Sequence, residues 1–288
     1  MIPVGGLVNV YGKPKTGKSF VVLGMAQAIT NGDETWEGFD VDKHGPVAYL
    51  QVDTPREEWA KRLETAQQMS HTDDIPFYVA DMWLIPKYPM DILEPDGQTL
   101  KWLKDEMERV QPIMVVIDTL REVHSGDEDS STTMRNVITN IVGACMPTQG
   151  SSRSVPAIVL ISHARKDAAG WQQDGQDDMM DQARGSSYVA GRMDVIIQVT
   201  QRTMKFKGRA TGEQRRSLFK NDQTGWVHVV QEDDGSQKHV QEIMERYPDA
   251  SVNSNAARLV EKMGYSMSTA TRRINQWIQK HRPPQQNP

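Results

Sequence analysis

The sequence predicts an α/β protein: a mainly parallel β-sheet sandwiched by helices, with an antiparallel edge, followed by a small helical domain. Three observations lead to this prediction. Short apolar runs alternate with longer stretches of helical period up to residue 199, as expected for strands covered by helices on both faces. After residue 199, polar and apolar positions alternate, which is typical of antiparallel strands. Beyond residue 235 the pattern is helical alone.

The elements are assigned in chain order from period and length. Buried parallel strands are expected at residues 7–10, 47–52, 113–117, 157–161 and 195–199. The helices between them are expected at 19–30, 57–68, 99–110 and 132–144. Antiparallel strands are expected at 203–207, 216–220 and 226–230, and the last three helices at 238–247, 254–263 and 268–281.

Composition excludes several classes of protein. The 288 residues include 33 Lys and Arg against 38 Asp and Glu, a net charge of −5, which excludes a nucleic-acid coat that works by bulk charge. A single cysteine, Cys145, excludes a disulfide framework and a cysteine-based zinc site, and fits a reducing cytoplasm. No apolar run approaches the ~18 residues of a membrane span, and the start lacks the features of a secretion signal. We therefore expect a soluble, cytoplasmic protein with no membrane partner.

Charge and composition also place a domain boundary near residue 235. Residues 236–288 hold eight basic and four acidic residues, net +4, whereas residues 1–235 hold 25 basic and 34 acidic residues, net −9. The linker-like segment Gln231–Gln237 separates the two parts, and residues 282–288 are expected to form a frayed tail. The sequence therefore predicts domains at 1–235 and 236–288.

The pattern G-x-x-x-x-G-K-S follows the first predicted strand and opens the first predicted helix, the context that a phosphate-binding loop requires. Its residues are Gly12, Lys13, Pro14, Lys15, Thr16, Gly17, Lys18 and Ser19, and we add the next residue, Phe20, to the expected nucleotide site. The glycines let the loop curl its N–H groups towards phosphate oxygens. Lys18 is expected to neutralise the β- and γ-phosphates of ATP, and Ser19 to ligate Mg²⁺. The alternative is a surface turn that matches by chance.

Two carboxylates and a histidine stand at the ends of later strands, at the edge of the sheet where ligands bind. Asp118 ends an apolar strand and is expected to hold the water shell of Mg²⁺, unless it only caps the strand. Asp53 is expected to orient and deprotonate the attacking water, or else to cap the helix that follows it. His163, or its neighbour Ser162, is expected to sense the γ-phosphate, the alternative being a structural histidine.

In their order along the chain, these motifs resemble the RecA-like ATPase core of plasmid RepA-type hexameric replicative helicases and their phage relatives. The matching strings are GKPKTGKS, WEG before GPVAYLQVD, IDTLREVHSGDED, ISHARKD and RGSSYVAGRMDVIIQV, over roughly residues 4–230. By position, the resemblance makes Lys18 and Ser19 nucleotide and Mg²⁺ ligands, Asp118 the Walker B acid and His163 the sensor. Asp53 falls where the family usually has a catalytic Glu, a departure that shortens the carboxylate by one methylene.

The segment KGRATG, residues 207–212, looks like the K-x-R finger that related ring helicases insert into a neighbour's site. A Lys and an Arg two apart on a strand share one face, so Lys207 and Arg209 can reach one γ-phosphate; the alternative is a basic hairpin tip. The loop 164–184 falls where RecA-like proteins hold DNA. Its excess of acids makes it a poor phosphate binder, although Trp171 is able to stack on a base.

The last three predicted helices look like a helix-turn-helix or its winged variant, with the turn at residues 264–266. The basic residues expected on its groove-entering helix are Arg272, Arg273, Lys280 and Arg282. The two alternatives for the binding partner of this domain are duplex DNA and another protein.

The prediction for the whole chain is an Mg·ATP hydrolase that moves on single-stranded DNA as a homo-oligomeric ring of six subunits, in plasmid or phage replication. The rivals are a DNA-binding P-loop switch and a recombinase or mediator ATPase, both without unwinding activity. A small-molecule kinase is disfavoured, because no Arg-rich lid follows the sheet core.

Overall fold

The computed structural model describes residues 1–68, 77–81, 91–148, 150–151, 153–164, 187–209, 211–221, 226–230, 236–263 and 267–281. The chain divides into two compact units, Met1–Val230 and Gln231–Pro288.

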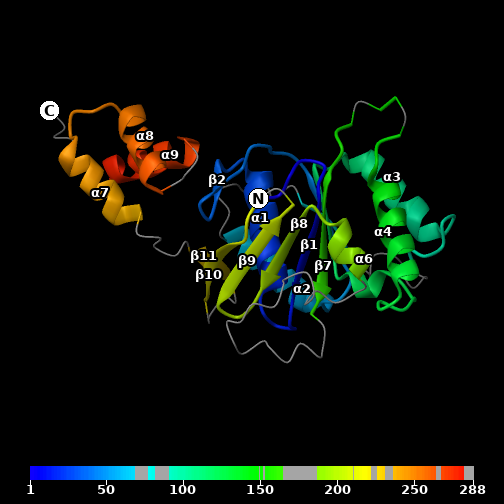
Figure 1. The fold of residues 1–288 in the computed structure, drawn as a ribbon. Helices are drawn as coiled ribbons and strands as arrows, with labels where there is room; N and C mark the ends of the chain where they lie inside the picture. The colour runs from blue at the N-terminus through cyan, green and yellow to red at the C-terminus, as the bar shows by residue number, and fades with distance from the viewer. Residues whose placement is uncertain are drawn as a thin grey trace. The chain divides into compact units, whose positions relative to one another are not determined.

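The first unit is built on a sheet whose described strands follow the order β11-β10-β9-β8-β1-β7-β6-β4-β5 (Figure 1). Its parallel strands are β1 (Leu7–Gly12), β4 (Val47–Gln51), β5 (Phe77–Asp81), β6 (Met114–Asp118), β7 (Ala157–His163) and β8 (Val195–Val199). The antiparallel edge is formed by β9 (Thr203–Gly208), β10 (Gln214–Lys220) and β11 (Val227–Val230). The predicted fold class, an α/β fold with a mainly parallel sheet and an antiparallel edge, is confirmed.

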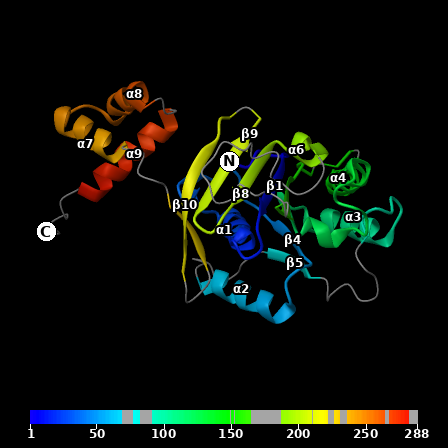
Figure 2. The ribbon, with the colours of Figure 1, turned by 60° about the horizontal axis from the view of Figure 1, so that its bottom comes forward.

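Helices cover both faces of this sheet (Figures 1 and 2). One face packs against α1 (Lys18–Asn31) and α2 (Arg56–Gln68). The other packs against α3 (Gln98–Val110), α4 (Ser131–Cys145) and α6 (Ser187–Arg192), together with the short 3₁₀ helix η1 (Leu120–Val123). All five central parallel strands (β1, β4, β6, β7 and β8) are therefore covered on both faces, which explains why apolar residues predominate in them.

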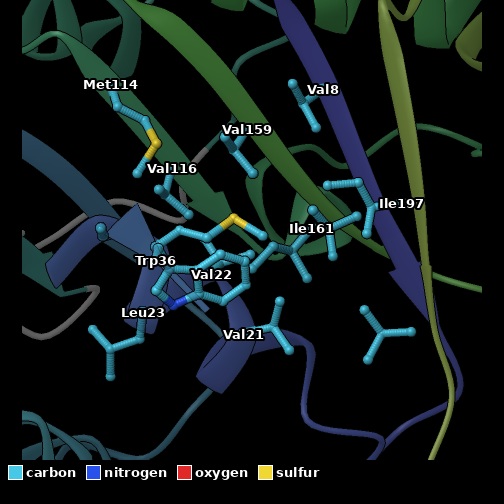
Figure 3. Close-up of a cluster of buried hydrophobic side chains, with 14 of the residues drawn as sticks. Val8, Val21, Val22, Leu23, Trp36, Met114, Val116, Val159, Ile161 and Ile197 are labelled. Atoms are coloured by element: carbon cyan, nitrogen blue, oxygen red, sulfur yellow. The ribbon is translucent and has the colours of Figure 1, made fainter. Parts of the chain in front are cut away.

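Alternation along β1 shows how the two cores form. Val8 and Val10 are fully buried on the α1 face, and Tyr11 is fully buried on the opposite face, because successive strand residues point to opposite sides. Figure 3 shows the α1-face core, where Val21 and Val22 of α1 lie against valine and isoleucine side chains of the strands. Helix α1 ends as expected at Asn31-Gly32, where Gly32 adopts a left-handed φ of 76°.

Two pieces of the first unit were not predicted. The edge strand β5 was not assigned, although other strands of the same length were. The hairpin of β2 (Thr35–Trp36) and β3 (Phe39–Asp40) has two residues in each strand, and the rings of Trp36 and Phe39 stack with centroids 5.8 Å apart. Strands of two residues are too short to show a period of two in the sequence.

The second unit contains α7 (Ser236–Arg246), α8 (Val252–Met263) and α9 (Met267–His281), all three close to the predicted ranges. These helices share a separate small core, which includes Val240, Ile243, Ala256, Leu259 and Ile274. The predicted turn at 264–266, the tail at 282–288, the linker residues 231–235 and the loop residues 165–186 with Trp171 lie outside the described residues. Within the described residues, no helix is both long and apolar enough to cross a bilayer.

Candidate functional site

The predicted phosphate-binding loop joins the carboxyl end of β1 to the start of α1. Its two glycines are required by close contacts. A Cβ on Gly12 would lie 2.1 Å from the carbonyl oxygen of Val199, at the end of the neighbouring strand β8. Gly17, which precedes α1, has a left-handed φ of 94°, and a Cβ there would lie 2.8 Å from the side chain of Val227. The loop therefore wraps tightly against the sheet, with the N-terminus of α1 behind it.

Lys18 is held at the base of this loop. Its Nζ donates hydrogen bonds to the carbonyl oxygens of Gly12, at 3.1 Å, and Lys13, at 3.0 Å. The residue is 6% exposed. Burial lowers its pKa below the ordinary value for lysine, and the carboxylates of Asp118 and Asp53 oppose that shift. The site thus presents a buried amine close to two acids, which suits it to meet the negative charge of a polyphosphate.

Asp118 ends β6 and faces the start of α1. It is 2% exposed, and burial raises its pKa above the ordinary range. Hydrogen bonds from the hydroxyls of Ser19 and Tyr49 oppose that shift by favouring the ionised carboxylate. A carboxylate and a hydroxyl oxygen in contact are the ligand types that Mg²⁺ takes alongside water and phosphate oxygens. Ser19 and Asp118 therefore fit the predicted metal, which would supply charge neutralisation at the phosphates.

Asp53 lies just beyond β4, beside Asp118. Gln51 pairs with Asp118 across β4 and β6, and the N–H of Val52 donates to the carbonyl oxygen of Asp118 at 2.8 Å. Asp53 is exposed, yet close enough to Lys18 to influence its pKa. Helix α2 begins at Arg56, so the position directly before it belongs to Pro55 and not to Asp53. Asp53 therefore does not occupy the capping position of α2, and its water-activating role stays a prediction.

His163 ends β7 directly opposite Gly12 of β1. The backbone N–H of the next residue, Ala164, donates to the carbonyl oxygen of Gly12 at 3.2 Å, and Lys18 donates to the same oxygen. The side chains of the two candidate sensor residues, Ser162 and His163, lie in different surroundings. Ser162 is 2% exposed and its hydroxyl donates to Asn9 Oδ1 at 2.9 Å in the sheet interior, so His163 is the candidate that lies beside the loop.

Lys207 and Arg209 lie at the opposite edge of the sheet. Gly208 pairs with Val195, where β8 begins, whereas the phosphate-binding loop adjoins the end of β8. Arg209 Nε donates to the carbonyl oxygen of Met193 at 2.9 Å and lies 3.5 Å from Asp194 Oδ1. Since β1 is six residues long, the two edges are roughly 17 Å apart. The structure does not bring these two residues to the site of their own subunit.

Two residues of the site, Tyr49 and Arg62, were not predicted from the sequence. Tyr49, in β4, donates its hydroxyl to Asp118 Oδ2 at 2.8 Å. Arg62, in α2, donates to Thr54 Oγ1 at 3.2 Å and lies 5.2 Å above the Phe20 ring. In the sequence, Tyr49 and Asp118 are 69 residues apart, and Arg62 and Phe20 are 42 residues apart. No local motif therefore signals either contact.

The antiparallel edge contributes to the same region. Trp226, directly before β11, packs edge-on against Phe20 with ring centroids 6.0 Å apart. Val227 lies against Gly17. The last strand of the sheet therefore closes one side of the loop and the first turn of α1.

A glycine loop with a buried lysine joins strand β1 to helix α1, and a buried carboxylate ends β6, two strands along from β1 in the sheet. This arrangement defines a P-loop ATPase site. A comparison with known protein families agrees with that class. A family profile described as an AAA domain matches residues 1–169, and the chain belongs to that family. Among solved structures, a KaiC-like protein from the hyperthermophilic archaeon Pyrococcus horikoshii OT3 is similar at 10% identity and a TM-score of 0.49, over 79% of this chain and 91% of that chain.

Proposed function

We propose that the protein hydrolyses Mg·ATP and couples hydrolysis to movement along single-stranded DNA, as a homo-oligomeric ring of six subunits that serves plasmid or phage replication. In this proposal Lys18 and the loop hold the phosphates, Ser19 and Asp118 hold Mg²⁺, and Asp53 activates the attacking water. His163 senses the γ-phosphate. The DNA partner and the replication role rest on the resemblance of the motif series to RepA-type helicases.

The position of Arg209 is the observation that supports a ring-shaped assembly. The phosphate-binding loop and Asp118 share one edge of the sheet, whereas Arg209 lies at the other. The Arg209 side chain is 57% exposed, so it is accessible from outside its own subunit. A basic residue of this kind that is too far from its own nucleotide is well placed to serve a neighbouring subunit's nucleotide, which requires a closed or helical assembly.

The test compares ATP turnover with and without single-stranded DNA, and then measures unwinding of a forked duplex. The proposal predicts strong stimulation by single strands together with unwinding. DNA binding without stimulated turnover or unwinding would instead identify a switch, and strand pairing without unwinding would identify a recombinase or mediator.

Asp53→Asn is expected to reduce ATP turnover by about 10²–10⁴-fold, the usual contribution of a general base, because an amide cannot accept a proton from water. ATP affinity should be nearly unchanged. Asp96→Asn is the matched control, since Asp96 is an exposed carboxylate in the loop before α3. Normal turnover in Asp53→Asn, measured by phosphate release, would rule out the catalytic role.

We further propose that residues 236–288 bind duplex DNA. The support is the three-helix arrangement with its own core and its net charge of +4. Because the two units have separate cores, removal of residues 236–288 should leave basal ATP turnover intact. Duplex affinity should fall, and the remaining binding should depend less steeply on salt, since fewer phosphates are neutralised. Equal duplex affinity of both proteins across a salt series would favour a protein partner instead.

A further inference from the structure

Tyr49 of β4 donates its hydroxyl to Asp118 Oδ2 at 2.8 Å. The contact follows from the register of the sheet. Tyr49 is aligned with Val116, and Asp118 lies two residues further along β6 on the same face. Both side chains are buried, Tyr49 with 1% and Asp118 with 2% of its surface exposed. A long side chain on β4 is therefore directed at the acid on β6, away from water.

The Tyr49 ring is itself fixed by packing. Trp59 of α2 lies against it, with ring centroids 4.9 Å apart and planes inclined by 41°. Trp59 is 2% exposed, so the pair forms part of the core between α2 and the sheet. The hydroxyl is consequently held in one place by side chains that have no role in the chemistry.

A buried carboxylate with one oxygen held by a fixed donor cannot rotate freely. Groups that hold a metal ligand in this way commonly contribute 10–100-fold to metal affinity or activity. We propose that Tyr49 is a positioning residue for Mg²⁺: by holding Oδ2 of Asp118, it keeps the carboxylate oriented towards Ser19 and the metal. The inference rests on the proposed ATPase function, in which Asp118 and Ser19 hold Mg²⁺.

The experiment uses Tyr49→Phe in the full chain, which keeps the ring against Trp59 and removes only the hydroxyl. ADP affinity is measured by calorimetry over a series of Mg²⁺ concentrations, and in EDTA. We expect unchanged ADP affinity in EDTA, while the Mg²⁺ concentration needed for half of the metal-dependent gain in affinity rises by about 10–100-fold. ATP turnover should be correspondingly low at limiting Mg²⁺ and recover at high Mg²⁺.

Two comparisons separate the effect of losing the hydrogen bond from an effect of altered packing. Trp59→Phe keeps an aromatic ring against Tyr49 and leaves the hydroxyl in place while it changes the packing, and it breaks no hydrogen bond of Trp59 Nε1 to the described residues. We expect its Mg²⁺ dependence to match the wild type. In an Asp118→Asn background, Tyr49→Phe should cause no further shift, because the carboxylate it orients is gone. Tyr247→Phe, in the second unit, is the control for loss of a hydroxyl elsewhere.

Three results would overturn the inference: an unchanged Mg²⁺ dependence in Tyr49→Phe, an equal shift in Trp59→Phe, or a full further shift in the Asp118→Asn background. These outcomes differ from failure of the proposed function. If ADP affinity of the wild type does not respond to Mg²⁺ at all, the metal site at Ser19 and Asp118 fails together with the inference. If the wild type responds but single-stranded DNA has no effect on turnover, only the DNA-coupled function fails.

Discussion

Lys18→Ala is expected to abolish measurable ATP turnover and to reduce ATP affinity by on the order of 10²–10⁴-fold. The magnitude follows from two lost hydrogen bonds to charged phosphate oxygens, at about 1.5–3 kcal/mol each. The structure places the amine where it makes this difference, because Lys18 is 6% exposed at the base of the loop, with Asp118 and Asp53 nearby. Equilibrium binding of a fluorescent ATP analogue and phosphate release are the two measurements.

The matched control is Lys101→Ala, which removes an exposed lysine from α3. It should leave both binding and turnover at the level of the wild type. Circular dichroism shows whether Lys18→Ala remains folded. A folded Lys18→Ala protein that still hydrolyses ATP at the normal rate would refute the assignment of the site.

Arg209→Ala is expected to reduce turnover by on the order of 10³-fold, the lower end of the effect of an arginine finger. ATP binding should survive, because a finger acts mainly on the transition state. The partners that Arg209 leaves behind are the backbone oxygens of Gly191 and Met193 and the carboxylate of Asp194. The Arg209 and Asp194 side chains are 57% and 43% exposed, so water is expected to replace the guanidinium without loss of the fold.

Mixing the two inactive proteins distinguishes a finger in trans from a residue that serves its own subunit. In a mixed ring, an intact loop from an Arg209→Ala subunit meets an intact Arg209 from a Lys18→Ala subunit. Partial recovery of turnover is therefore expected. Arg109→Ala, on the exposed side of α3, is the control for loss of a surface arginine. If labelled subunits exchange and no activity returns, the hairpin-tip interpretation of residues 207–212 replaces the finger.

The fold was predictable where its strands are buried on both faces. Runs such as Ile113–Ile117 have no polar position, and only a strand covered by helices on both sides requires that pattern. Two boundaries moved outward, however: β1 extends to Gly12 and β7 to His163, because hydrogen-bonding to neighbouring strands continues past the last apolar residue. Strand β5, which pairs with β4 at the edge of the sheet, was not predicted.

The site was predictable where its residues stand in a short motif or directly after a recognisable strand. The loop from Gly12 to Ser19 carries its own signature, and Asp118 directly follows a recognisable strand. Tyr49 and Arg62 had no such signal, because each reaches the site across the fold: Tyr49 from a neighbouring strand and Arg62 from α2, over Phe20. The restraint of Arg209 by Met193 and Asp194 likewise depends on the antiparallel pairing of β8 with β9, which the sequence pattern does not specify residue by residue.

The central claim is that this P-loop ATPase works as a ring on single-stranded DNA. Native mass spectrometry tests it most directly, with the 32.5 kDa chain measured alone, with Mg²⁺ and a slowly hydrolysed ATP analogue, and with both plus an oligonucleotide. We expect six copies of the chain with one bound strand in the last condition. A strict monomer under all three conditions would contradict it.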